Sequence, residues 1–243
     1  MIREYLKNHI LITDGATGTY YAELTGDSTR YCELANVDHP ERIRQIHTEY
    51  IKAGAHLIRT NTFAANSVTL NLTRDQLKPI LVQAVHHART AVGNGDCFIA
   101  ANIGPIPRAG MADLDILDEY RFLVDTFLDE GLTVFNFETF SDLEYLPEIT
   151  GYIKSRMPNA FIITQFTITA DGFTRKGIRL EKVISQLQQI ASIDAYGFNC
   201  GVGPAHLNRL LEKMDWGNDL VAALPNAGYP EIINERTVYV HNP

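Results

Sequence analysis

Short apolar segments alternate with helix-periodic segments along this chain, and that alternation limits the fold more than any other feature. Apolar segments of strand length occupy residues 10–13, 56–63, 97–103, 133–139, 160–167, 195–199 and 220–224. Amphipathic patterns of helical period occupy residues 77–92, 117–128, 142–157, 180–193 and 205–214, and a further one ends at Gly54. Strands that alternate with helices in this way pair in parallel. The sequence therefore predicts an α/β protein.

The spacing of the strands and the residues at their ends favour a barrel. The strands recur at intervals of about 25 to 45 residues, as in a (β/α)8 barrel. A polar residue ends nearly every strand: Asp14, Asn61, Asn102, Glu138, Gln165, Asn199 and Asn226. A ring of such groups fits a barrel mouth better than the single crevice of a doubly wound sheet, whose Gly-x-Gly-x-x-Gly fingerprint is not clearly present. We predict a TIM-type barrel lacking its eighth strand, as one domain over residues 1–243.

Composition excludes several classes of partner. The formal net charge of −8 disfavours nucleic acid and anionic lipid, because both would be repelled. No uninterrupted apolar run approaches the roughly 20 residues of a membrane span, and no secretory signal pattern opens the chain. The three cysteines, Cys32, Cys97 and Cys200, are an odd number and widely spaced, which is not a disulfide framework. We predict a soluble, cytoplasmic protein.

A thiol stands on the turn after the sixth predicted strand. Cys200 directly follows residues 195–199 and precedes a helical pattern, and Gly201 and Gly203 let the backbone approach closely around it. In αβ repeats this end of the strand faces the ligand. A small buried core residue is the alternative interpretation of Cys200, and it is the interpretation we favour for Cys97. Cys32 has no metal-binding or redox spacing beside it.

Two carboxylates are candidates for a substrate site. Glu138 ends an apolar strand, where an unpaired buried carboxylate would be costly. It either pairs with an arginine or receives a substrate ammonium, and its place at the predicted barrel mouth favours the ammonium. Asp14 is open to two interpretations as well, because Asp-Gly is a common turn pair.

Taken together, the motifs resemble those of the homocysteine S-methyltransferase family. Residues 14–19 (DGATGT) are similar to the family's Asp-Gly-Ala-Met-Gly-Thr motif, with Thr17 in the methionine position. The family's other motifs follow in the same order: 60–63 (TNTF), 103–105 (IGP), 138–139 (ET) with Asp142 and Glu144, 197–200 (GFNC) with 203–204 (GP), and 225–228 (PNAG). The resemblance covers nearly the whole chain. Within the family, the chain resembles the N-terminal domain of a bacterial bifunctional homocysteine S-methyltransferase and methylenetetrahydrofolate reductase.

The resemblance implies a zinc-dependent barrel that methylates the sulfur of homocysteine to give methionine. In the family three cysteines hold zinc, one at the position of Cys200 and two in a Gly-Gly-Cys-Cys motif, and homocysteine supplies the fourth ligand of an open site. A zinc-bound thiol is deprotonated and can attack an electrophilic methyl group. Carried over by position, Asp14 and Glu138 hold the substrate's amino group, Gly15 and Thr62 meet its carboxylate, and Asn226 lies near the metal.

The sequence departs from the family where the metal is concerned. No adjacent cysteine pair occurs in the 243 residues, so we expect a chain truncated before Gly-Gly-Cys-Cys. We expect it to bind zinc weakly and to be inactive. A barrel without its eighth strand would leave open edges, which favours a dimer, aggregation or a rearranged C-terminus. Two alternatives remain: a non-catalytic relative that binds an amino acid or a partner chain without metal, and a barrel lyase with Glu138 as base. The motifs do not indicate the methyl donor; a methylated folate is favoured by analogy.

Overall fold

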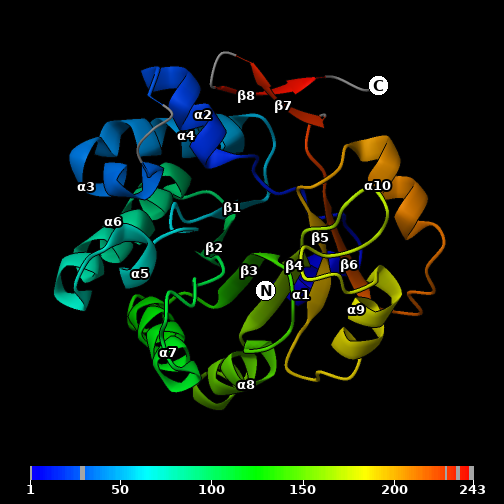
Figure 1. Ribbon diagram of the computed structural model, residues 1–243. Coiled ribbons are helices and arrows are strands. Elements are labelled where there is room, and N and C mark those ends of the chain that lie inside the picture. The colour runs from blue at the N-terminus through cyan, green and yellow to red at the C-terminus, as the bar shows by residue number, and fades with distance from the viewer. Residues whose placement is uncertain (1, 28–30, 228, 234–235, 241–243) are drawn as a thin grey trace. The chain divides into compact units, whose positions relative to one another are not determined.

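A computed structural model describes residues 2–27, 31–227, 229–233 and 236–240 (Figure 1). Six strands form one sheet in chain order: β1 (Leu57–Arg59), β2 (Phe98–Ile103), β3 (Val134–Phe140), β4 (Phe161–Phe166), β5 (Ala195–Asn199) and β6 (Leu220–Leu224). The pairs β1–β2, β4–β5 and β5–β6 are parallel. Neighbouring strands are thus consecutive in sequence and joined by helical connections, which confirms the predicted α/β class and the strand order of a (β/α)8 fold.

Helices connect the strands. They are α1 (Ile2–Leu6), α2 (Thr17–Thr25), α3 (Ala35–Asp38), α4 (Pro40–Lys52), α5 (Ser67–Leu70), α6 (Arg74–Val92), α7 (Asp113–Asp129), α8 (Leu146–Arg156), α9 (Leu180–Leu187) and α10 (Pro204–Leu211), with the 3-10 turn η1 (Cys32–Leu34). Helix α6 begins at a capping box, in which the Thr73 and Gln76 side chains bond each other's backbone N–H groups. None of the described helices has the length and hydropathy needed to cross a membrane.

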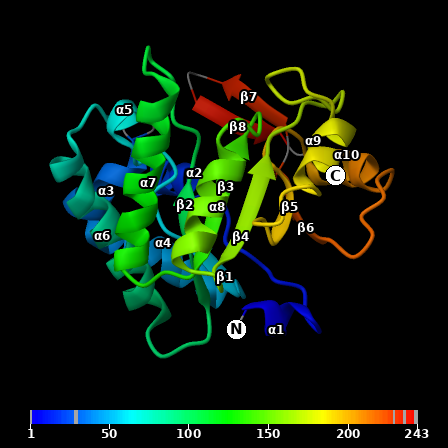
Figure 2. The ribbon, with the colours of Figure 1, turned by 90° about the horizontal axis from the view of Figure 1, so that it is seen from below.

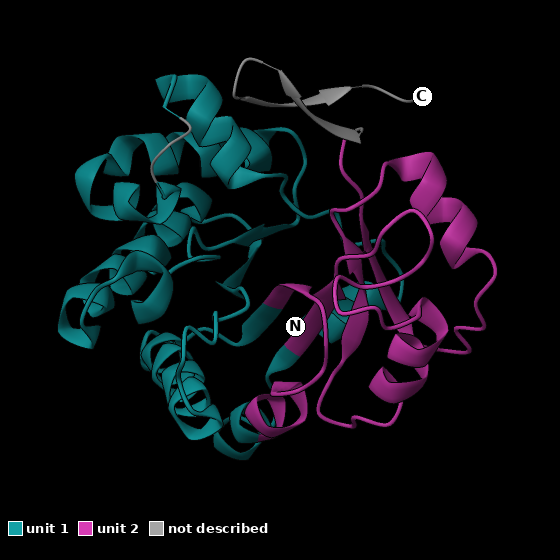
Figure 3. Ribbon diagram, in the orientation of Figure 1, with its two compact units in different colours: residues 1–136, 152–161 teal, residues 137–151, 162–243 magenta. Residues whose placement is uncertain are grey.

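The chain divides into two compact units (Figure 3). Unit 1 comprises Met1–Asn136 and Tyr152–Phe161. In it α4 packs against α3 and α6, and Ile43 and Ile46 of α4 are fully buried with Tyr21 and Ala35. These are the inward positions that the helical period of α4 predicts. That residues 1–243 fold as one domain stays a prediction.

Unit 2 comprises Phe137–Gly151 and Ile162–Pro243. Every residue of β4 is buried, as expected for a central strand of a parallel sheet. Both views of the ribbon place α9 and α10 beside β5 and β6 (Figures 1 and 2). In contrast to β4, strand β6 is the last in the sheet order and exposes Leu220 and Val221, whose relative exposures are 36% and 40%.

The structure differs from the sequence-based expectation at both ends of the chain. Residues 10–13 do not form a strand: Thr13 alone bridges Leu57, and Ile10 is 86% exposed. The long loop expected up to residue 36 is also wrong, because α2, η1 and α3 lie there. Glycine and β-branched threonine have low helix propensity, which hid the start of α2.

The segment after β6 also differs from expectation. Strands β7 (Tyr229–Ile233) and β8 (Arg236–Val240) form a separate antiparallel pair with Tyr229 opposite Val240, where a trailing segment was expected. A proline inside a short run argues against a strand, and Pro230 lies in β7.

Candidate functional site

The Asn199 side chain, at the end of β5 in unit 2, joins two of the predicted site residues. Its Nδ2 lies 2.6 Å from Thr139 Oγ1, 3.3 Å from Cys200 Sγ and 3.4 Å from Glu138 Oε1. Its Oδ1 accepts a hydrogen bond from the Thr139 backbone N–H at 3.1 Å. The amide is 1% exposed and uses both its donor and its acceptor capacity. The structure therefore brings the carboxylate of Glu138 and the thiol of Cys200 to one side chain.

Two residues beside Asn199 have an unusual backbone conformation. Thr139 and Cys200 have φ angles of 64° and 57°. A positive φ is rare for a β-branched residue and costs about 1–3 kcal/mol unless the surroundings hold it in place. The hydrogen bonds from Asn199 hold Thr139, and the Cys200 N–H donates to the Leu224 carbonyl at 3.0 Å. Such outliers concentrate at functional sites, which marks these two strand ends.

The turn after Cys200 requires glycine. Gly201 has a φ of 72°, and a Cβ built on it would lie 2.1 Å from the backbone oxygen of Ile168. The next turn residue, Val202, accepts a hydrogen bond at its carbonyl from the Asn226 N–H at 3.0 Å. The half-buried Asn226 is thus bonded to the turn that carries Cys200. Three predicted site residues, Glu138, Cys200 and Asn226, therefore lie at or just after strand ends in unit 2.

In unit 1 the predicted residue Asp14 is buried and engaged by Arg59. Its Oδ1 accepts from Arg59 Nε at 2.7 Å, and its Oδ2 accepts from the Arg59 backbone N–H at 2.9 Å. Arg59 also donates to the Gly15 carbonyl at 2.7 Å. Burial raises the pKa of Asp14, and the neighbouring guanidinium opposes that shift. Sequence analysis missed Arg59, although a charged residue inside an apolar strand is itself a signal that a partner must exist.

Thr62 and Gly15, the other predicted residues of unit 1, have close neighbours. The buried Thr62 hydroxyl donates to the Asn102 carbonyl at 2.7 Å and lies 2.7 Å from Thr60 Oγ1. A Cβ on Gly15 would lie 2.7 Å from the hydroxyl of Tyr50, so glycine permits this close approach. Gly15 therefore has no room for a side chain beside Tyr50, and the Thr62 hydroxyl already has protein partners.

The residues described do not by themselves fit a zinc site of three thiolates. Cys32 donates to Asn61 Oδ1 at 3.1 Å, and burial raises its pKa above the ordinary value. Burial, with a contribution from Asp14, raises the pKa of Cys97 to about 11. An ordinary thiol pKa already lies above neutrality, and these shifts further favour the protonated form of both thiols in the metal-free chain, whereas the form that binds metal is the thiolate. Within the described ranges no group of three or more Cys, His, Asp or Glu side chains is placed to hold a metal.

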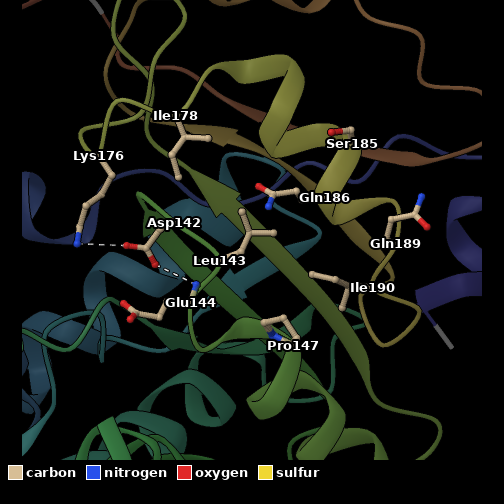
Figure 4. A pocket seen from close by; sticks show the side chains of 10 residues that line it. All are labelled: Asp142, Leu143, Glu144, Pro147, Lys176, Ile178, Ser185, Gln186, Gln189 and Ile190. Carbon is tan, nitrogen blue, oxygen red and sulfur yellow. Dashed lines mark hydrogen bonds and ion pairs between the residues drawn. The ribbon is translucent and has the colours of Figure 1, made fainter. Parts of the chain in front are cut away.

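A surface cavity of about 690 Å³ in unit 2 lies apart from the predicted residues (Figure 4). It is lined by Asp142, Leu143, Glu144, Pro147, Lys176, Ile178, Ser185, Gln186, Gln189 and Ile190. Asp142 accepts from the Glu144 N–H at 3.0 Å and pairs with Lys176 at 3.6 Å. Asp142 and Glu144, which belong to the family motif, therefore line this cavity, while Glu138 does not.

The sequence pattern of one family, described as homocysteine S-methyltransferase, matches residues 11–243. The chain belongs to this family. It is 26% identical to the methionine synthases of Mycobacterium leprae and Mycobacterium tuberculosis over 93% of its own length. It covers 21% of each, so it spans about a fifth of these curated relatives.

Solved structures show the fold. The homocysteine methyltransferase MmuM from Escherichia coli, in its oxidized form, superimposes with a TM-score of 0.75 at 21% identity, covering 93% of this chain and 85% of MmuM. Its metallated form gives the same TM-score at 19% identity. At this identity the likeness shows the fold alone, and it confirms the predicted TIM-type architecture.

Proposed function

We propose that this chain binds homocysteine and serves transfer of a methyl group to its sulfur, giving methionine. The observation that carries the proposal is the cluster in unit 2, where Asn199 holds the Glu138 carboxylate beside the Cys200 thiol. Family membership supports the reaction class, and the match to methionine synthases supports the product. The family also removes the alternative of an unrelated barrel lyase.

The residues of this chain have distinct parts in the proposed binding. Glu138 is half-buried and receives the ammonium of homocysteine through charge-assisted hydrogen bonds. Asp14 of unit 1 is assigned to the ammonium by its position in the family motif alone; its side chain is buried, and both its oxygens accept from Arg59. Gly15 and Thr62 are assigned to the carboxylate of the substrate. Asn199 keeps the Glu138 carboxylate and the Cys200 thiol at a fixed separation.

The proposal assigns a single zinc ligand to this chain, the thiol of Cys200. A zinc ion supplies deprotonation of the substrate thiol in sites of this kind. Cys200 is the thiol of this chain that we assign to it, with Asn226 nearby as a group that orients the site. One thiolate does not complete a tetrahedral site, so we propose that the 243-residue chain holds zinc weakly or not at all. A cytoplasmic location is likewise our prediction.

The test is calorimetric titration of the purified chain with homocysteine. Glu138→Gln should weaken binding about tenfold or more, because a hydrogen bond to a charged group is worth about 1.5–3 kcal/mol. Affinity for 4-mercaptobutanoate, which lacks the amino group, should not change. Glu144→Gln is the matched control, since Glu144 lines the separate surface cavity. Equal homocysteine affinity for Glu138→Gln and the unmodified chain would contradict the assignment.

A second candidate function is amino-acid binding without catalysis. It is favoured by the absence, among the residues described, of a cluster that could hold a metal. The two proposals share the binding step and differ in the next one. Formation of methionine by the chain supplied with zinc and a methylated folate would favour the enzyme. Homocysteine binding without turnover would favour the relative that only binds.

A further inference from the structure

One buried acceptor in unit 2 has no hydrogen-bond partner within the described chain. Gln165 of β4 is 1% exposed, and its Oε1 is buried and unpaired. The neighbouring residue Thr164 is fully buried, and its Oγ1 is unpaired as well. Buried polar atoms are almost always bonded to protein, water or a ligand, so each of the two requires an explanation.

The strand register places these two side chains on opposite faces of the sheet. Thr164 pairs with Tyr196 and Gln165 pairs with Gly197 across β4 and β5. Paired residues of neighbouring strands share a face, and successive residues alternate. The Tyr196 hydroxyl donates to Asp219, which also accepts from Gln188 beyond the end of α9. Thr164 therefore belongs to the helix-covered face, and Gln165 to the other.

The face of Gln165 is the one that carries the candidate site. Asn199 lies two residues after Gly197 on β5, about 6.6 Å along the strand, and so shares this face. Its side chain reaches Glu138 and Cys200. Gly197 contributes no side chain beside Gln165, because a Cβ there would lie 1.8 Å from the backbone oxygen of Ala222. Gln165 therefore presents an unpaired acceptor on the same sheet face as Asn199, the residue whose side chain contacts Glu138.

We propose that Gln165 is a further substrate-contacting residue, whose Oε1 accepts a hydrogen bond from the ammonium of homocysteine. This assignment rests on the proposed function and extends it. Homocysteine has one group with several strong donors, its ammonium, and Glu138 alone does not use all three N–H bonds. A site built to bond an amine rejects analogues that lack it, because its buried acceptors would then stay unpaired. Gln165 thus sets the preference for an α-amino thiol over a plain thiol.

Gln165→Met tests the assignment, because methionine has a similar volume and no strong acceptor. Homocysteine affinity should fall about tenfold, the worth of a hydrogen bond to a charged group. Affinity for 4-mercaptobutanoate should not change. The melting temperature should rise by about 2–4 °C, because the unpaired buried oxygen is gone. Thr164→Val is the matched control: it should raise the melting temperature similarly and leave homocysteine affinity unchanged.

A measurement on the unmodified chain does not depend on the variants folding. The side-chain amide resonance of Gln165 should shift on addition of homocysteine and stay in place on addition of 4-mercaptobutanoate. An unmoved resonance, or unchanged homocysteine affinity in Gln165→Met, would overturn the assignment while leaving the proposed function intact. If Gln165→Met bound homocysteine and 4-mercaptobutanoate more weakly by the same factor and melted at a lower temperature, Gln165 would have a structural role. That result would also overturn the assignment. Failure of the unmodified chain to bind homocysteine would overturn the proposed function and this assignment together.

Discussion

At the scale of the residue, one amide organises the candidate site of unit 2. The two N–H bonds of Asn199 Nδ2 face three acceptors, on Glu138, Thr139 and Cys200, and its Oδ1 accepts from the Thr139 backbone N–H. An alanine or leucine at this position would leave the Thr139 N–H unpaired and the positive φ of that residue unsupported. The distance between the Glu138 carboxylate and the Cys200 thiol is therefore a property of Asn199 as much as of the strands.

His47 gives unit 1 a predictable response to acid. It is fully buried on α4, and neither ring nitrogen has a partner in the described residues. Burial, with a smaller contribution from His87, lowers the pKa of His47 to about 4. The unfolded chain, with an ordinary histidine pKa near 6.5, takes up the proton first as the pH falls. This contribution to stability is complete above about pH 6.5 and is lost as the pH falls toward 4.

The expected loss is about 2 kcal/mol between pH 7 and pH 5, at about 1.4 kcal/mol per pH unit below 6.5. Urea unfolding at the two pH values measures it. His47→Leu should remove this part of the pH dependence, whereas the exposed His39→Gln should retain it. The same loss in His47→Leu as in the unmodified chain would place the acid sensitivity elsewhere.

Sequence reasoning could find the chemistry-bearing residues but not their partners. Glu138 and Cys200 could be named because each follows an apolar strand, and strand ends carry function in αβ repeats. Arg59 was missed because the ion pair with Asp14 joins residues 45 positions apart, and neither residue reveals the other. The polar residue Asn199 was noted, but its bond to Glu138 spans 61 positions.

At the scale of the element, predictability followed the strength of the apolar pattern. The strands at 195–199 and 220–224 match β5 and β6 residue for residue, because each is an apolar run bounded by polar or turn residues. Residues 10–13 carry the same pattern and do not form a strand: their described backbone pairing with the β1 region is limited to the bridge between Thr13 and Leu57 and to the Ile12 carbonyl, which accepts from the N–H groups of His56 and Leu57. Whether a pairing partner exists is a tertiary fact that local pattern does not contain.

The exposed edge of β6 predicts self-association. As the last strand of the sheet it has β5 on one side only, and Val221 is 40% exposed. An apolar edge of this kind pairs with other chains, and a charged residue blocks the pairing. We expect sedimentation velocity to show concentration-dependent dimers or larger species, and Val221→Lys to shift the population to monomer. Leu114→Lys, at a helix position that is 76% exposed, is the matched control. A monomer at all concentrations would contradict the prediction.

At the scale of the whole molecule, family membership and metal chemistry have to be kept apart. The family match extends over residues 11–243, and the fold is that of MmuM. A fold positions strand ends, and it does not supply the side chains that a given reaction needs. The 243 residues contain three cysteines, and two of them, Cys32 and Cys97, lie in unit 1, where burial raises the pKa of each thiol.

With one assigned thiolate ligand, Cys200, the chain should retain zinc poorly. A zinc site held by three thiolates retains its metal through dialysis, whereas a single thiolate competes poorly with water and buffer. We expect metal analysis of the dialysed chain to find far less than one zinc per molecule. Cys200→Ala should then leave the low zinc content unchanged and preserve homocysteine binding through Glu138. One tightly held zinc per chain, lost in Cys200→Ala, would contradict this and require further ligands within the 243 residues.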